Sequence, residues 1–478
     1  MKLCCFLLAL RFAWCLLPQY GYIHPDEFFQ TVEIVAGDVL DVKVLTAWEF
    51  NSSRPIRSIT VPHLLFSPLF HALRVFNAAT PYLVLIIPRV AMTTATMIAE
   101  CYIGKTATRL GYDASGCHLL LASSYVSLVY LTRTFSNSVE YLLFALLLHQ
   151  CVHNRSAFTV SLLLTLGVFN RPTFVAFACV PVINWLKGSL LNRTLTCLMN
   201  GIAMSCVIIL CDTLYFTGSI SSNFIITPLN FLLYNSQSSN LAEHGVHPLY
   251  THILVNTPLL FGPLALAWLS QGRHDHFLCL SYFIPLLFLS VFPHQEPRFL
   301  LPLLIPICII NSGNKRLAIW LTFNALAAIL YGHLHQAGVV KSLIQSSEFK
   351  GCTHLVYYHT YMPPRHLTLQ SKSSSSEARE DSCSSVSVHD LMSSPLPTVQ
   401  EYLFSIAIKN PLANVYLVAP ASLDLGGFIT KEKYAFCPHL STENLPRLNF
   451  EKGILNGIYE MFNDMCLKMY EVDVGIRS

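Results

Sequence analysis

Two adjacent carboxylates near the N-terminus are the first candidates for chemistry in this chain. The segment reads His24-Pro25-Asp26-Glu27 and follows a long apolar run. Carboxylates beside an apolar surface are costly unless they are solvated, paired or used. One of the two can act as a general base while its neighbour orients a substrate hydroxyl. We therefore expect Asp26 and Glu27 to be catalytic.

Two other interpretations of this segment stay open. Pro25 suits the first position of a helix, and Asp26 and Glu27 would then complement the positive end of the helix dipole in a solvated helix start. The tripeptide His24-Pro25-Asp26 also occurs in J-domain co-chaperones, but no basic, soluble helical hairpin surrounds it here.

Further polar residues gather at the ends of other apolar runs, where acids, histidines and arginines are mixed. Such clusters suit an anionic, hydroxylated substrate, because the arginine fork binds phosphate oxygens bidentately. The sequence contains no Gly-rich phosphate loop and no nucleotide fingerprint, so a lipid-linked donor fits better than a soluble sugar nucleotide. The candidate substrate-binding residues are His24, Glu49, Arg57, Asp212, His244, His247, His294, Glu296 and Arg298.

Composition defines the kind of scaffold that must position these residues. Of the 478 residues, 53% are hydrophobic and only 12% are charged, against roughly 25% charged in an average soluble domain. The mean hydropathy is +0.49 and the formal net charge is +3. These values exclude a disordered chain, a nucleic-acid-binding protein and an ordinary cytosolic enzyme. We expect a polytopic α-helical membrane protein.

Twelve apolar runs approach the ~20 residues that a helix needs to cross a bilayer. Several are short or interrupted by proline, so we expect about 10–12 membrane segments. Arg11 interrupts the first run and no small-x-small cleavage site follows it, which favours a membrane segment over a signal peptide. The runs are 3–19, 61–78, 81–104, 116–132, 138–153, 157–169, 172–186, 195–211, 249–270, 277–293, 299–313 and 317–337.

The basic loops predict the orientation. Lys315 and Arg316 are the only formal charges between residues 299 and 340, so their loop should be cytosolic, as should the loop with Lys187 and Arg193. Counting spans back from Lys187 makes Lys105 and Arg109 cytosolic, whereas counting forward from residue 60 places them on the far side, so one run among residues 61–186 must be re-entrant or interfacial. Counting outward places these segments on the far side: 21–60, 212–250, 294–298 and the C-terminal region 341–478.

The C-terminal region differs in composition from residues 1–340. It holds 26 of the 57 charged residues. Residues 371–395 contain eleven serines and predict a flexible linker. A strand-like pattern at 415–419 and a helix-like pattern at 456–470 suggest a small α+β domain. The cysteine spacing of this region fits no metal site. We expect one or two disulfides if the region faces an oxidising compartment. The four cysteines of this region are Cys352, Cys383, Cys437 and Cys466.

Several motifs, in order between residues 12 and 370, resemble those of the glycosyltransferase family 22 mannosyltransferases, which are GT-C-fold enzymes of the endoplasmic reticulum. These motifs are Tyr22-Ile-His24-Pro-Asp26-Glu27-Phe-Phe-Gln30, Trp48-Glu49-Phe50 with Arg57-Ser58, Arg133-Thr-Phe-Ser-Asn137, Phe169-Asn-Arg171-Pro-Thr-Phe174, Thr227-Pro-Leu-Asn-Phe231 with Tyr234-Asn235, and His294-Gln-Glu296-Pro-Arg298. Two more, Leu241-Ala-Glu-His244-Gly-Val-His247 and His359-Thr-Tyr-Met-Pro-Pro-Arg365-His366, resemble the members that add a fourth mannose to GPI precursors.

The resemblance implies transfer of mannose from dolichyl-phosphate-mannose to the third mannose of a GPI precursor, through an α1,2 bond in the lumen. It places the base at Asp26 or Glu27, with Asp26 as our first choice. The β-linked donor gives an α-linked product, so a single inverting displacement is expected, with Arg298 and His294 near the leaving phosphate. We expect no metal, no cofactor and no nucleic-acid partner; the partners are the donor, the trimannosyl acceptor and the lipids of the endoplasmic reticulum membrane.

Two alternatives to this function stay open. The same chemistry could act on an earlier GPI mannose or on a lipid-linked N-glycan precursor. A polytopic transporter or scramblase would instead carry charges near the midpoints of its spans, yet apart from Arg11, Arg89, Glu100 and Glu140 the charges cluster at the ends.

Overall fold

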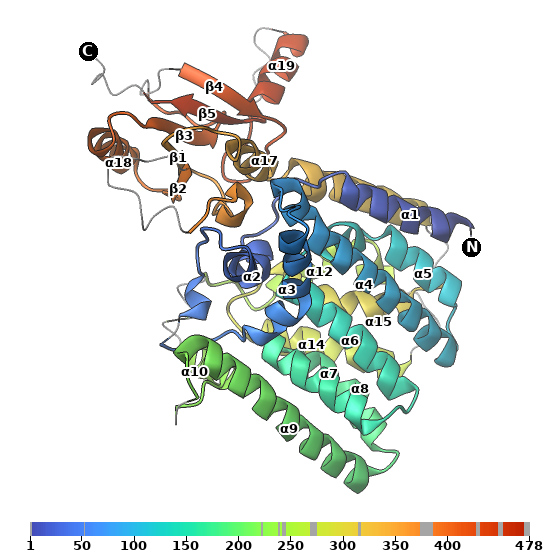
Figure 1. Ribbon diagram of the computed structural model, residues 1–478. Coiled ribbons are helices and arrows are strands. Elements are labelled where there is room, and N and C mark those ends of the chain that lie inside the picture. Colours follow the sequence, from blue (N-terminus) through green and yellow to red (C-terminus); the bar gives the residue numbers. More distant parts are fainter. Residues whose placement is uncertain are drawn as a thin grey trace. The chain divides into compact units, whose positions relative to one another are not determined.

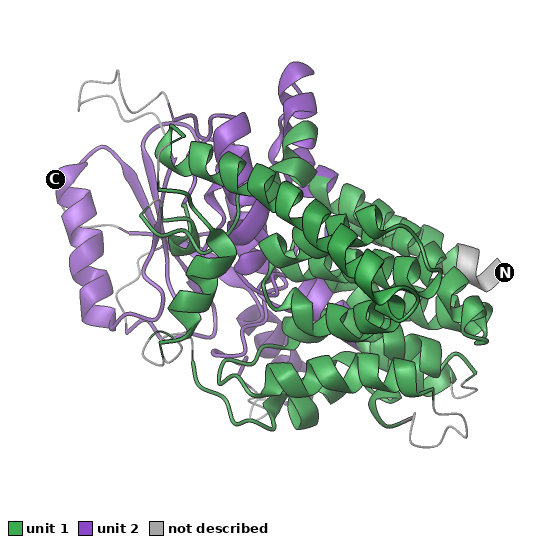
Figure 2. Cartoon of the chain, turned by 90° about the horizontal axis from the view of Figure 1, so that it is seen from below, with its two compact units in different colours: residues 1–17, 46–68, 88–326 green, residues 18–45, 69–87, 327–478 purple. Residues whose placement is uncertain are grey.

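The computed structural model describes residues 2–51, 53–220, 223–237, 240, 245–267, 275–313, 317–372, 386–426, 431–447 and 453–472. The chain forms two compact units (Figure 2). The predicted loop 21–60 is shared between them, whereas the predicted boundary between residues 340 and 341 stays a prediction. Unit 1 comprises Met1–Leu17, Thr46–Pro68 and Pro88–Leu326, and unit 2 comprises Pro18–Leu45, Leu69–Ile87 and Ala327–Ser478.

Each of the twelve predicted apolar runs contains helix. Within the described residues, three helical stretches are long and apolar enough to cross a membrane: Pro81–Arg109, Leu190–Thr217 and Leu317–Leu334. The number of segments that cross the bilayer stays a prediction. The helices are α1 (Lys2–Leu16), α3 (Thr60–Val75), α4 (Pro81–Arg109), α5 (Ala114–Ser123), α6 (Ser136–Val152), α7 (Ala157–Asn170), α8 (Phe174–Leu186), α9 (Leu190–Thr217), α10 (Thr227–Asn235), α12 (Thr257–Phe261), α13 (Leu264–Ala267), α14 (His276–Ser290), α15 (Leu304–Ile310) and α16 (Leu317–Ile329).

Neighbouring apolar helices of unit 1 pack side by side. Helix α6 packs against α7 and α8, α7 packs against α9, and α8 packs against α14 (Figure 1). A charge inside the first apolar run is compensated, because Arg11 of α1 donates to both carboxylate oxygens of Glu100 in α4, at 2.8 and 3.3 Å. Both residues are buried. A charge in a membrane segment is tolerated when it has such a partner.

The C-terminal region carries a five-stranded sheet with the order β2-β1-β3-β5-β4 (Figure 1). The first three strands are parallel, whereas β5 is antiparallel to β3 and β4. Helix α18 (Leu396–Lys409) covers one face with Val399, Leu403 and Ile406, which pack against Val356 and Leu417. The strands are β1 (Thr353–Tyr357), β2 (Val386–Asp390), β3 (Asn414–Pro420), β4 (Lys431–Phe436) and β5 (Leu467–Glu471).

Two patterns in this region differ from their predictions. The helix predicted over 456–470 ends earlier, because α19 spans Ile454–Asp464 and Leu467–Glu471 is strand β5. Leu467 and Met469 alternate with more exposed residues, as in a strand with one face against a core. Of the predicted Ser-rich linker, residues 373–385 lie outside the described part, and Val386–Asp390 forms β2.

Candidate active site

Asp26 and Glu27 lie in the first turn of a helical segment of unit 2. The amide of Phe28 donates to the carbonyl of Pro25 at 3.0 Å, so Pro25 opens this turn. The segment continues as a π-helical turn, Phe28–Val32, and as α2, Glu33–Val39. The helix start that the sequence suggested is therefore present, and π-helical turns are frequent at functional sites.

The two adjacent acids differ in their surroundings. The side chain of Asp26 keeps 22% of its surface exposed, whereas Glu27 is 0% exposed. The amide of Gln30, one helical turn further, donates to Oδ2 of Asp26. Nδ1 of His24 lies 3.4 Å from Oδ1 of Asp26 and accepts from the Asp26 amide at 3.2 Å. Asp26 is thus the oriented and accessible carboxylate of the pair.

A third acid of the same segment, Glu33, ties it to a distant part of unit 2. Its carboxylate is fully buried and accepts from the amides of Leu45 at 3.1 Å, Arg365 at 3.0 Å and His366 at 3.3 Å. It also forms a hydrogen bond with Nδ1 of His366. These contacts fix α2 to the segment that begins at His359.

That segment brings aromatic rings close to the acids. The ring of Tyr361 lies 6.4 Å from His24 and 5.6 Å from the buried Tyr22. The hydroxyl of Tyr22 donates to the carbonyl of Met362 at 2.8 Å. Burial and the neighbouring Glu27 raise the pKa of Tyr22 well above its ordinary value. Because Tyr22 stays protonated, it holds this segment as a hydrogen-bond donor.

The predicted acid of the second loop, Asp212, lies near the end of α9 in unit 1. It is fully buried. Oδ1 accepts from the hydroxyls of Ser58 at 3.0 Å and Thr60 at 2.7 Å and from the amide of Thr60 at 3.2 Å, while Oδ2 accepts from Thr227 at 3.2 Å. Asp212 therefore joins the end of α9 to the first residues of α3 and α10.

Glu49 and Arg57 form an ion pair in unit 1. Nε of Arg57 donates to Glu49 at 3.0 Å, and its Nη1 lies 3.5 Å from the carbonyl oxygen of Asn170. Asn170 in turn donates to the carbonyl of Ser136 at 2.9 Å. The next residue, Arg171, donates to the hydroxyl of Ser136 at 3.3 Å.

The motif around residues 294–298 is arranged around one carboxylate. Glu296 accepts from Arg298 through Nη2 at 2.9 Å and through Nε, and it lies 2.8 Å from Nε2 of His294. The ring of Phe299 contacts two guanidinium groups: Arg298 at 5.3 Å and Arg171 at 4.9 Å from its centroid. Contacts therefore link Arg57, Arg171 and Arg298 into one basic cluster of unit 1.

His247 contacts the same motif from another loop. Its Nδ1 accepts from the amide of Gln295 at 3.3 Å, and its ring lies 6.0 Å from that of His294. The buried Gln295 holds this loop by accepting from the amide of His252 at 2.7 Å. His244, which was predicted beside His247, lies outside the described residues.

The predicted residues thus fall into two groups. Asp26, Glu27 and His24 belong to unit 2, and the remaining described candidates belong to unit 1. Across the described residues, no three His, Cys, Asp or Glu side chains form a group that could hold a metal ion. The unit 1 candidates are Glu49, Arg57, Asp212, His247, His294, Glu296 and Arg298.

Three further residues of the site were not predicted as site residues from the sequence. Gln30 stands four positions after Asp26, a spacing at which helical side chains meet, so this contact was accessible to sequence analysis. Arg171 stands in a quoted motif, but its approach to Phe299 joins positions 128 residues apart by number. Glu33 pairs with His366 across 333 positions, which no local pattern predicts.

Comparison with known proteins places these residues in a family. The Alg9-like mannosyltransferase family matches residues 2–367 of the chain. The human protein GPI alpha-1,2-mannosyltransferase 4 is 37% identical over 75% of this chain and 74% of its own length. GPI mannosyltransferase 4 of Saccharomyces cerevisiae is 34% identical, covering 87% and 88%, and that of Candida albicans is 30% identical, covering 95% and 98%. No solved structure matches.

Proposed function

The chain belongs to the Alg9-like mannosyltransferase family, and from this premise we propose that it transfers mannose from dolichyl-phosphate-mannose to the third mannose of a GPI precursor through an α1,2 bond. As a mannosyltransferase it uses a lipid-linked sugar donor and a glycolipid acceptor. The relatives that cover most of the chain are named GPI mannosyltransferase 4. Their names support the GPI acceptor.

We propose Asp26 as the general base. The observation that carries this proposal is its partial exposure beside the fully buried Glu27. A base must reach the acceptor hydroxyl within hydrogen-bond distance, and Gln30 orients one oxygen of Asp26 while the other faces His24. In this scheme Asp26 takes the proton of the acceptor 2-hydroxyl as its oxygen attacks the anomeric carbon. A catalytic role for Glu27 stays a prediction.

The basic cluster of unit 1 would receive the phosphate of the donor. A guanidinium has five N–H donors, so an arginine that one carboxylate orients can still donate to a phosphate. Arg298 and Arg171, which both contact the ring of Phe299, are the first choices, and Arg57 extends the cluster. The leaving dolichyl phosphate is already a good leaving group, so these residues would stabilise charge and no acid is needed. The roles of Glu49, Asp212, His247, His294 and Glu296 in substrate binding stay predictions.

We further propose that the protein lies in the endoplasmic reticulum membrane with Asp26 in the lumen. The basic loops support this orientation, and the family supports a GT-C arrangement of the membrane helices. In this topology the first loop 21–60 and the C-terminal region 341–478 are luminal.

The test is an activity assay on microsomes from cells that lack the endogenous enzyme. Asp26→Asn should lower the transfer of mannose to a trimannosyl GPI acceptor by roughly 10²–10⁴-fold at unchanged protein abundance. Asp38→Asn is the matched control, because Asp38 is an exposed acid of the same helical segment. Full activity of Asp26→Asn would refute the base assignment. Accumulation of a dimannosyl GPI or an N-glycan intermediate after removal of the protein would refute the proposed acceptor.

A further inference from the structure

Helix α19 exposes an unusually apolar face. Four of its large side chains are mostly exposed: Leu455 at 83%, Tyr459 at 75%, Ile454 at 70% and Phe462 at 60%. At 100° per residue these side chains and Ile458 fall within one arc of the helix. The buried residue of this helix is Gly457. The opposite arc carries the polar residues Asn456, Glu460, Asn463 and Asp464.

An apolar face of this kind indicates an interaction surface. Single exposed hydrophobic residues are ordinary, but a contiguous apolar patch with a polar border marks contact with a protein or a membrane. A helix with one apolar and one polar face is the form that lies in a bilayer interface. What covers α19 can be inferred from how its end is tethered.

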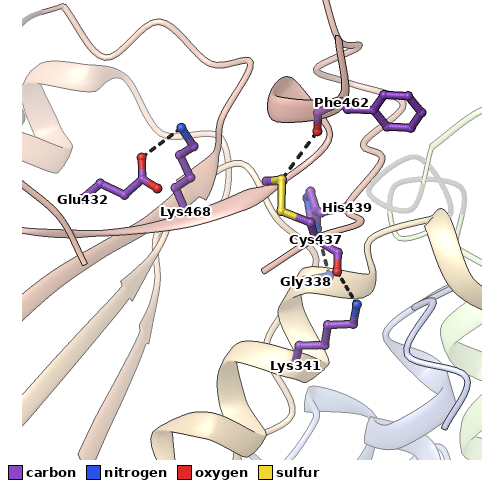
Figure 3. Close-up of a disulfide and its surroundings, with 8 residues drawn as sticks. Gly338, Lys341, Glu432, Cys437, His439, Phe462 and Lys468 are labelled. Carbon is purple, nitrogen blue, oxygen red and sulfur yellow. Dashed lines mark hydrogen bonds and ion pairs between the residues drawn. A yellow bond between two sulfur atoms is a disulfide. The ribbon is translucent and has the colours of Figure 1, made fainter. Parts of the chain in front are cut away.

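The C-terminal end of α19 is held close to the end of an apolar helix within unit 2. Cys466, two residues after α19, forms a disulfide with Cys437, and their Cα atoms are 4.4 Å apart (Figure 3). Three residues after Cys437, the amide of Leu440 donates to the carbonyl of Leu334 at 2.8 Å. Leu334 is the last residue of the apolar stretch Leu317–Leu334.

Further contacts fix the same junction. The amide of Gln336 donates to the carbonyl of Leu440 at 3.0 Å, and Lys341 of α17 (Ala337–Ser346) donates to the carbonyl of Cys437. A chain residue spans at most ~3.6 Å, so Cys466, two residues after the end of α19, lies within roughly 20 Å of Leu334. In Figure 3 the ring of Phe462 points away from the disulfide while its carbonyl faces the sulfur.

We propose that α19 lies in the headgroup region of the bilayer, on the side of the membrane that the C-terminal region occupies, with its apolar face toward the acyl chains. The apolar helix that ends at Leu334 places the bilayer close to α19. A protein partner, by contrast, would first have to bind from solution. Tyr459 suits the headgroup level, because its ring is apolar and its hydroxyl is polar. The described helix has no lysine or arginine, so burial of apolar side chains, not attraction to anionic lipids, holds it there.

The test uses the full chain in phosphatidylcholine proteoliposomes that contain a phosphatidylcholine with a clickable acyl tail. A photoreactive amino acid is placed at Tyr459 and, as the matched control, at the exposed Asn463 on the polar arc of the same helix. A second control is Ile408 of α18, which is apolar and 62% exposed but lies on a helix without this tether. We expect lipid adducts at position 459 to exceed those at both controls by on the order of tenfold.

Three results would overturn the proposal. The first is equal lipid labelling at positions 459 and 463. The second is labelling of protein alone at position 459, which would assign the apolar face to a protein partner or a second copy. The third is lipid labelling that appears only after anionic lipid is added, because it would show electrostatic adsorption. Equal yields with and without anionic lipid support the proposal.

Discussion

Two acids that the sequence marks as functional sit in opposite environments. Asp26 is partly exposed and its carboxylate accepts from Gln30, whereas Asp212 is buried and accepts four hydrogen bonds from Ser58, Thr60 and Thr227. A carboxylate whose lone pairs are occupied by the protein has little capacity left for a substrate. Asp26 is therefore the solvent-accessible acid of the two, whereas the four bonds of Asp212 join α9 to the first residues of α3 and α10, and we expect a structural role for Asp212.

The largest effect is expected at Glu33, which is a second buried acid whose carboxylate accepts several hydrogen bonds. Glu33→Ala leaves the amides of Leu45, Arg365 and His366 without this buried acceptor. We expect a loss of about 3–5 kcal/mol in unfolding free energy, as for a broken buried charged pair. The measurement is the melting temperature and monodispersity of the detergent-solubilised full chain, compared with Asp38→Asn. An unchanged melting temperature for Glu33→Ala would contradict the structural role.

Asp212→Asn tests whether Asp212 has a structural role and no direct part in the reaction. An amide keeps one acceptor oxygen but loses the acceptor for Thr227, so we expect a cost of about 1–3 kcal/mol. Protein abundance should fall while the activity per folded molecule stays near that of the wild type. Thr227→Val is the matched variant, since it removes the same bond from the other end. If Asp212→Asn folds normally but loses more than about a hundredfold in activity, Asp212 takes part in the reaction and the comparison fails.

Gln30→Ala has the smallest expected effect. It removes one hydrogen-bond donor to Asp26 without changing the proposed base itself. One hydrogen bond of about 1 kcal/mol corresponds to a loss of roughly five- to tenfold in kcat. KM for the acceptor should stay unchanged, which separates a positioning role from a binding role. Thr31→Ala is the control, because the hydroxyl of Thr31 donates to the backbone oxygen of Glu27 in the same helical segment. An equal loss in both variants would point to a general disturbance of the helix.

The helical scaffold was accessible from the sequence, and the tertiary contacts of the site were not. Long apolar runs carry their own signal, because a membrane helix satisfies its backbone bonds locally. The start of the helical segment at Pro25 follows from proline's fixed geometry. By contrast, Glu33–His366 and Arg171–Phe299 join distant positions. Strand β5 was predicted as helix, because its alternation covers only Leu467–Glu471 and follows a true helix directly.

The ion pair between Arg11 and Glu100 has a consequence for shortened forms of the protein. A product of a downstream start codon that lacked the first helix would insert Glu100 into hydrocarbon without its counter-charge, at a cost of about 3–5 kcal/mol. An unrelated membrane helix in place of the first helix would restore insertion of the chain into the membrane, but it would not neutralise the charge of Glu100. Such a form should therefore be recognised as misassembled and degraded, and should not persist as a weaker enzyme.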